Sequence, residues 1–286
     1  MRMRSTTIRK DYKAGDKFGY FLMSDLHLDS PEHDRKLLIR ELDYAIKMNA
    51  DILIGGDVFD FILKGDNKRF TNSRNKYPGE DAVLNHAIEE AFKVLSPYAK
   101  NIKAILLGNH EASVIKFHSI DILAMLIDRL NDLEGVNIDY CGYQAYIRIR
   151  YEYEKGNHCE TYVIKATHGS GGGSPVTKGT ISLNRYMNMY QADLYFSGHT
   201  HSKVILPCEP QGYLDQNGTP KWRERKAIVT GAYVKPIELE PTSKLGRANP
   251  YNINYGDNMK SLQSTGGVMI EHEFISSKEY ITRIIA

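Results

Sequence analysis

The sequence is poor in cysteine and shows no cysteine pairing pattern. Its 286 residues include three cysteines, Cys141, Cys159 and Cys208, and none of them belongs to a C-x-x-C pair. An odd number of cysteines without such a pair argues against a disulfide framework and fits a reducing compartment. We therefore expect free thiols.

The chain also lacks a long apolar segment. No stretch reaches the roughly 20 consecutive apolar residues that a membrane-spanning helix needs. The first ten residues, MRMRSTTIRK, are basic, but they have neither the apolar core nor the small-residue cleavage site of a signal peptide. We expect a soluble protein of the cytoplasm with no integral membrane segment.

A strong net charge is missing as well. The formal charge is +2 and the isoelectric point is about 8.2, which is too mild to imply nucleic-acid or membrane binding by itself. With 42% hydrophobic and 25% charged residues, the composition is that of an ordinary globular protein. Any electrostatic argument about a partner must therefore be local.

The first third of the chain alternates strand and helix patterns. Apolar runs at 18–24 and 51–57 are typical of buried strands. Ser30 and Pro31 predict a helix start between them, because Ser caps helices and Pro is tolerated in the first turn. This segment predicts a βαβ unit.

The pattern changes after residue 140. Apolar and charged residues alternate over 147–154, which indicates a strand with one wet face. We expect it to pair antiparallel with 161–166. Further helices are predicted around 84–95, 123–130 and 181–191, and further strands at 102–107, 193–197, 203–207, 226–233, 266–274 and 279–284.

These elements predict an α/β fold in a single domain over residues 1–286. Two mixed β-sheets packed face to face, with helices on the outer faces, would bury both kinds of strand in a four-layer αββα sandwich. The core motifs would lie within 18–202. Long rim loops are expected at 208–225 and 234–265.

Potential ligands stand where the predicted strands end. Gly55 and Gly56 allow a sharp turn, so Asp57 follows a buried strand, at the edge where open α/β sheets place their chemistry. Other strand ends carry five of the ten histidines. The full set is Asp25, His27, Asp57, Asn109, His110, His168, His199 and His201.

This mixture predicts a metal centre. A single histidine at a strand end is usually structural, but carboxylates, an amide and several imidazoles recur here in the same context. Nitrogen and oxygen ligands without thiolate suit Mn, with Fe, Zn or Ni as alternatives. Eight groups are too many for one ion and suit two divalent ions about 3.5–4 Å apart that share a carboxylate.

The order of these segments resembles a known family. Taken together, they are similar to the five ordered motifs of the calcineurin-like metallophosphoesterase superfamily. The segments are Asp25-Leu-His27, Gly56-Asp57, Gly108-Asn-His-Glu111, His168-Gly169 and Gly198-His-Thr-His201.

The resemblance implies a role for each residue. Asp25, His27 and His201 would hold one ion, and Asn109, His168 and His199 would hold the other. Asp57 would bridge the two ions. His110 matches the family's non-ligand histidine, which stabilises developing charge or protonates the leaving alkoxide.

The chemistry of these groups agrees with those roles. Two cations lower the pKa of a bridging water and neutralise phosphate oxygens during in-line attack. The leaving oxygen still needs a proton, which an imidazole can give because it titrates near neutral pH. Asp29, Asp60 and Glu111 lie beside the ligands, where they either orient the histidines or belong to a solvated surface.

The branch of the family bears on the substrate. Protein phosphatases of the family have Arg before Gly-Asn-His-Glu and Asp-Arg-Gly after the central Gly-Asp. This chain has Leu107 and Val58-Phe-Asp-Phe61 at those places. Its motifs are more similar to the phosphodiesterase, nuclease and lipid-A-pathway pyrophosphatase branches, and the last of these usually has Arg in place of His110.

Two basic segments are candidate substrate contacts. The loop 64–76 has a local net charge of +4, with Lys64, Lys68, Arg69 and Arg74 among its cations. The segment 221–226 has a net charge of +3 and holds the only tryptophan, Trp222, next to Arg223. Either segment would attract a polyanion, and Trp222 would stack a base; solvated surface charge is the alternative.

The sequence thus predicts a two-metal phosphoester hydrolase. We expect a phosphodiesterase that acts on nucleic acid or a nucleotide. One alternative is a phosphomonoesterase that acts on a small phosphorylated metabolite or nucleotide. The other is a non-catalytic scaffold on the same fold.

Overall fold

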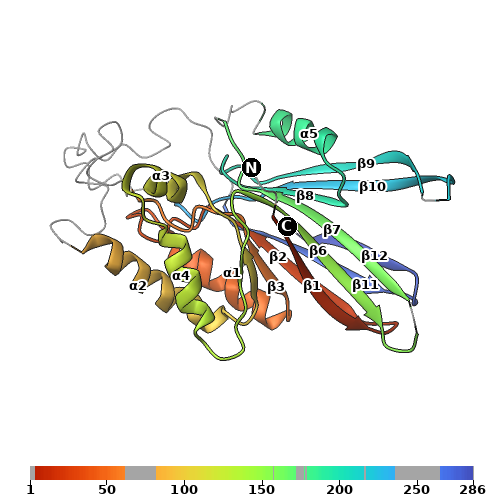
Figure 1. The fold of residues 1–286 in the computed structure, drawn as a ribbon, viewed down its shortest axis with the longest axis horizontal. Helices are drawn as coiled ribbons and strands as arrows, with labels where there is room; N and C mark the ends of the chain where they lie inside the picture. The colour runs from red at the N-terminus through yellow and green to blue at the C-terminus, as the bar shows by residue number, and fades with distance from the viewer. Residues whose placement is uncertain are drawn as a thin grey trace, which may run out of the picture.

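Two six-stranded sheets form the centre of the molecule (Figure 1). The structure is a computed structural model that describes residues 4–61, 82–156, 158–171, 177, 179–215, 217–235 and 265–285, without the side chains of 207–209. We call the two sheets sheet A and sheet B.

Sheet A is mixed. Its strands β1 and β6 are parallel, β6 and β7 antiparallel, β7, β8 and β10 parallel, and β10 and β9 antiparallel. In spatial order they are β1 (Arg4–Tyr12), β6 (Gln144–Tyr153), β7 (Cys159–Thr167), β8 (Leu194–Ser197), β10 (Pro220–Val229) and β9 (Val204–Leu214).

Sheet B is also mixed. Strands β2 to β5 are parallel, whereas β11 is antiparallel to both of its neighbours. In spatial order they are β12 (Tyr280–Ile285), β11 (Val268–Phe274), β2 (Lys17–Met23), β3 (Asp51–Ile54), β4 (Ile102–Ile105) and β5 (Asp139–Tyr140).

Helices cover the outer face of each sheet, with α1, α2 and α4 on one side and α5 on the other (Figure 1). The helices are α1 (Arg35–Lys47), α2 (Val83–Leu95) with the 3-10 turn η2 (Ser96–Tyr98), α3 (Asn109–His118), α4 (Ile122–Asn131) and α5 (Thr180–Met189).

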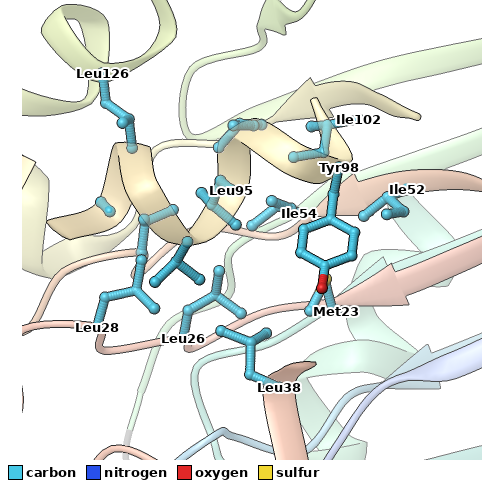
Figure 2. Packing of buried hydrophobic residues seen from close by; sticks show 14 of the residues in the cluster. Met23, Leu26, Leu28, Leu38, Ile52, Ile54, Leu95, Tyr98, Ile102 and Leu126 are labelled. Carbon is cyan, nitrogen blue, oxygen red and sulfur yellow. The ribbon is translucent and has the colours of Figure 1, made fainter. Parts of the chain in front are cut away.

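Three apolar layers hold these elements together. One lies between sheet B and its helices, where Leu38, Leu95 and Leu126 pack with Ile52 and Ile54 (Figure 2). A second fills the space between the two sheets, and a third joins α5 to sheet A. This layering confirms the predicted αββα sandwich.

Two predictions about local structure were wrong. The predicted rim loop at 208–225 is largely the hairpin of β9 and β10. The first helix begins at Arg35, not at Ser30, because the Asp34 carboxylate caps it by accepting the Leu37 N–H at 3.0 Å.

The described residues test several other predictions, some of them only in part. The loop predicted at 234–265 lies outside them except at its ends. Cys141 and Cys159 are free thiols, as expected. In the part of the chain that the structure describes, no helix has the length and apolar character that a bilayer crossing requires. The single domain over 1–286 stays a prediction.

Candidate metal centre

The predicted ligands converge at one edge of the sandwich. Sheet B delivers Asp25 and His27 after β2, Asp57 after β3, and Asn109 after β4. Sheet A delivers its share from neighbouring parallel strands, with His168 after β7 and His199 and His201 after β8. Carboxyl ends of parallel strands lie at the same edge of a sheet, which explains why distant segments meet here.

The backbone of the ligand loops is unusual. Asp25, His27, Asp57, His199 and His201 all have positive φ, between 46° and 70°. Non-glycine residues adopt this left-handed conformation rarely, and it persists where the surroundings enforce it. The enforcement is visible in hydrogen bonds between the loops: Asp25 N–H donates to Gly56 O at 2.9 Å, and His27 N–H donates to Asp57 O at 3.1 Å.

Two glycines let the loops approach one another closely. A Cβ atom on Gly108 would overlap the Asp57 carboxylate and its backbone nitrogen. A Cβ atom on Gly198 would overlap Ser24 and the Asp25 carboxylate. Neither glycine has a positive φ, so close packing against the carboxylates is what requires glycine at these two positions.

The first group of candidate ligands contains Asp25, His27 and His201. One atom from each lies within 4.8 Å of the others. The two Nε2 atoms of His27 and His201 are 3.3 Å apart, and His201 Nε2 is 3.2 Å from Asp25 Oδ1. Asp25 is completely buried, and both of its oxygens accept the backbone N–H of His199.

The second group contains Asp57, His168 and His199, again within 4.8 Å. His168 Nε2 is 3.1 Å from Asp57 Oδ2, and its Nδ1 lies 2.8 Å from Gly55 O. A hydrogen bond to that carbonyl fixes Nδ1 as the protonated nitrogen and leaves Nε2 for a ligand. The Asn109 amide Oδ1 is 2.9 Å from His168 Nε2 and 2.6 Å from His199 Nδ1.

His110 lies beside the bridge position rather than inside either group. Its Nε2 is 3.9 Å from Asp57 Oδ2, and its backbone N–H donates to Asp57 Oδ1 at 3.0 Å. Its Nδ1 contacts the backbone oxygen of Asp60 and lies 3.4 Å from Asp60 Oδ1. Asp60 Oδ1 is also 3.4 Å from His27 Nδ1. Asp60 therefore contacts both a proposed metal ligand, His27, and the proposed non-ligand histidine, His110.

Charge pairing dominates the electrostatics of the site. Burial alone would raise the pKa of Asp25, but His201, with His168 and His27, holds it well below its usual range. Burial opposes charge on His168, yet Asp57 outweighs burial and raises the pKa of His168 to about 9. For His110 the charges of Asp57 and Asp60 likewise outweigh burial and raise the pKa. The carboxylates thus favour the protonated forms of His168 and His110, whereas burial, with the charge of His168, lowers the pKa of His199.

Two further carboxylates support the loops without joining either group. Asp29 accepts the backbone N–H groups of Asp60 and Phe61, at 2.5 and 2.9 Å. Glu111 accepts those of Phe59 and Gly108, at 2.9 and 3.0 Å. Burial, with the Asp60 charge, raises the pKa of Asp29 to about 6; burial, with the Asp57 charge, raises that of Glu111 to about 7.

The donor set fits divalent metal ions. Imidazole nitrogens and carboxylate oxygens converge within 4.8 Å in each group, and the described members include no thiolate. The Nε2 atoms of His27 and His201 lie 3.3 Å apart, close enough for both nitrogens to coordinate one cation. A third overlapping triad, His27, Asp57 and His110, places Asp57 between the two groups.

Of the predicted substrate contacts, the two that the structure describes, Trp222 and Arg223, do not join this cluster. Lys64, Lys68, Arg69 and Arg74 lie outside the described residues. Strands β10 and β8 are parallel, and Lys226 of β10 pairs with Leu194 at the amino end of β8. Trp222 and Arg223 come before Lys226, so they lie past the amino ends of these strands, whereas the candidate ligands follow the carboxyl ends. Figure 1 shows the β9–β10 hairpin projecting away from α3. Arg223 Nε pairs with Asp193 Oδ1 at 3.1 Å.

Some supporting residues were not foreseen. The Ser24 hydroxyl contacts Asp25 Oδ2 and lies 2.7 Å from the Thr230 hydroxyl, and the Tyr143 hydroxyl donates to Gly169 O at 2.6 Å. Ser24 is next to Asp25 in the sequence, which was the only available signal for it. Thr230 and Tyr143 are ordinary residues at strand ends, and nothing in their local sequence indicates the contact.

Several solved structures resemble this fold. A predicted phosphoesterase from Streptococcus pneumoniae is 11% identical, with a TM-score of 0.33, and the match covers 94% of this chain and 100% of that chain. A metallophosphoesterase from Sphaerobacter thermophilus is 14% identical, with a TM-score of 0.32 over 94% and 88% of the chains. GAP50, the anchor in the inner membrane complex of Plasmodium, is 12% identical, with a TM-score of 0.44 over 94% and 84%.

The family assignment rests on sequence. No curated protein matches the chain. The family described as calcineurin-like phosphoesterase matches residues 20–203, which is more than half of the chain and contains every ligand of both groups. The protein therefore belongs to the calcineurin-like phosphoesterase family and is a metal-dependent phosphoester hydrolase.

Proposed function

We propose that the protein is a phosphodiesterase that acts on nucleic acid or a nucleotide with two divalent metal ions, Mn in preference to Fe, Zn or Ni. The observation that supports it is the convergence of Asp57 with ligands from both sheets. When bound, the ions would supply an acidified water and neutralise the phosphate oxygens. Asp25, His27 and His201 would hold one ion, Asn109, His168 and His199 the other, and Asp57 both.

His110 is the proposed general acid. Its side chain is 17% exposed, whereas that of His168 is fully buried, so His110 can meet a substrate. Burial opposes charge on this imidazole, but Asp57 and Asp60 outweigh burial and raise the pKa of His110, which favours its protonated form. A protonated imidazole at this position can deliver a proton to the leaving alkoxide and stabilise its developing charge.

Two apolar residues favour a diester over a monoester. Phe61 is buried and lies 5.0 Å from the Phe59 ring, and Leu107 packs against the helix side of sheet B. These residues stand where the protein-phosphatase branch has arginines. A phosphomonoester carries a charge of about −2 near neutral pH and needs more cationic partners than a diester with a single negative charge.

The first test compares bis-p-nitrophenyl phosphate with p-nitrophenyl phosphate in the presence of Mn. We expect faster hydrolysis of the diester, loss of activity with EDTA, and loss of activity in Asp57→Asn. Asn tolerates the left-handed backbone at this position, so the variant should keep its fold. The matched control is Asp193→Asn, a carboxylate at the opposite edge of sheet A that accepts the Val163 N–H at 2.7 Å.

The outcomes separate the candidates. Preference for the monoester would overturn the diesterase proposal in favour of a phosphomonoesterase. No turnover of either substrate with any divalent metal would favour the scaffold. A subsequent comparison of single-stranded oligonucleotides with mononucleotide diesters would define the substrate class.

A further inference from the structure

Glu111 is a buried carboxylate that the proposed chemistry does not use. It lies in the first turn of α3, two residues after Asn109, and its side chain is completely inaccessible to solvent. It belongs to none of the three ligand triads. A buried carboxylate is costly unless its oxygens are well hydrogen-bonded, so its contacts indicate what it does.

Each oxygen of Glu111 is committed to a different loop. Oε1 accepts the N–H of Phe59, two residues after Asp57. Oε2 accepts the N–H of Gly108, the residue before Asn109. The carboxylate thus joins the loop that leaves β3 to the loop that leaves β4, at 2.9 and 3.0 Å.

These two loops carry ligands that must keep a fixed separation. Gly108 has no room for a Cβ atom against Asp57, so the loops are already in contact there. On the other side of the contact, the His110 N–H donates to Asp57 Oδ1 at 3.0 Å. The Glu111 carboxylate provides a second connection between the loops. Together with the His110 N–H contact, it fixes Asp57 relative to Asn109.

We propose that Glu111 is a positioning residue that sets the distance between Asp57 and Asn109, and thereby the affinity for the ion held by Asn109, His168 and His199. This inference rests on the proposed two-metal centre. The Asp25, His27 and His201 group depends on Glu111 only through the shared Asp57, because its other ligands follow β2 and β8, whereas Glu111 accepts from the loops after β3 and β4.

The test is Mn binding to metal-free protein, measured by titration calorimetry without substrate. In Glu111→Gln the amide oxygen can accept only one of the two N–H groups, and the amide nitrogen faces the other donor. We expect one of the two binding steps to weaken at least ten-fold, with less than three-fold change in the other.

Asp193→Asn is the matched control for a merely structural role. Asp193 also joins two segments, through Val163 N–H at 2.7 Å and Arg223 at 3.1 Å, but at the far edge of sheet A. It should lower thermal stability and leave both Mn steps unchanged. If Glu111→Gln does not fold, Glu111→Asp, whose shorter side chain cannot reach both donors, should show the same selective loss.

Two results would overturn the inference. One is unchanged Mn binding in the folded Glu111 variant. The other is an equal loss at both steps, which would indicate general loosening. Failure of the wild-type protein to bind Mn is a different result, since it would overturn the proposed metal centre itself and the inference with it.

Discussion

His110 occupies a position that no other histidine of the site shares. It touches Asp57 and Asp60 but belongs to neither the Asp25 group nor the His168 group, and it retains some exposure. His110 can therefore act as an acid without being needed to hold either ion. A substitution here should affect the leaving group and spare the ions.

We predict that His110→Asn lowers kcat about 10²- to 10⁴-fold on a diester with an alkoxide leaving group. The loss should be smaller with p-nitrophenolate, which leaves without a proton. Mn binding should be unchanged. Equal losses on both substrates, or loss of Mn, would contradict the acid role.

His272 is a second histidine whose environment predicts a measurable effect. It is completely buried between the sheets, where Nδ1 lies 2.5 Å from the Tyr151 hydroxyl, itself 2.8 Å from that of Tyr20. Burial, with a contribution from Lys226, lowers the pKa of His272 to about 3. The native protein therefore keeps this imidazole neutral at pH values where the unfolded chain protonates it.

The consequence is a loss of stability in acid. Between pH 6.5 and about 3 the unfolded state binds one proton more than the native state, so the free energy of unfolding falls as pH falls, by up to about 1.4 kcal/mol per unit. Urea unfolding at several pH values should show a shallower dependence in His272→Gln than in wild type. Parallel curves for the two proteins would contradict this account.

At the scale of elements, α3 connects the ligand loops to the helical layer. It begins at Asn109, directly after the Gly108 contact with Asp57, and buries only Glu111 and Val114. Its first turn supplies both the His110 N–H and the Glu111 carboxylate to the site. The start of this helix must therefore stay close to the loop that follows β3.

We predict that Gly108→Ala abolishes binding of the ion held by Asn109, His168 and His199 and lowers the free energy of unfolding by about 1–3 kcal/mol, because the methyl group would push Asp57 away. Gly156→Ala is the control, since the nearest atom to its added Cβ is Tyr153 Cδ1 at 3.9 Å. Mn titration and thermal unfolding measure both effects. Normal Mn binding in Gly108→Ala would show that the loops can separate without harm.

The β9–β10 hairpin leads to a different expectation. Trp222 is 76% exposed, and the register of β10 with β8 puts it beyond the edge opposite the ligands. We predict that Trp222→Ala leaves kcat/KM for bis-p-nitrophenyl phosphate within two-fold of wild type. A ten-fold loss on this small diester would require the hairpin to reach the metal centre.

Sequence patterns predicted the elements with strong periodicity and failed on the others. β1 was missed because only Ile8 and Tyr12 in it are buried, so no regular alternation stands out. α3 was missed because it starts inside a ligand motif without an intervening loop. The hairpin was mistaken for a loop because of Pro207, Pro210 and Pro220, which the edge strand β9 and the first position of β10 tolerate.

At the scale of the whole molecule, the site exists only because the two sheets pack together. The proposed ligands follow β2, β3 and β4 of sheet B and β7 and β8 of sheet A. The sequence could predict that these residues come together because each of them follows a recognisable strand. It could not predict the supporting contacts of Asp29, Glu111 and Thr230, because these join segments whose proximity depends on the packing of the finished fold.

The central claim is that Asp57 lies between two metal ions. Anomalous diffraction at the Mn absorption edge, from crystals grown with Mn, tests it most directly. The account predicts two peaks about 3.5–4 Å apart, one beside Asp25, His27 and His201 and the other beside Asn109, His168 and His199, with Asp57 between them. No peak, or a single peak with Asp57 unliganded, would contradict it.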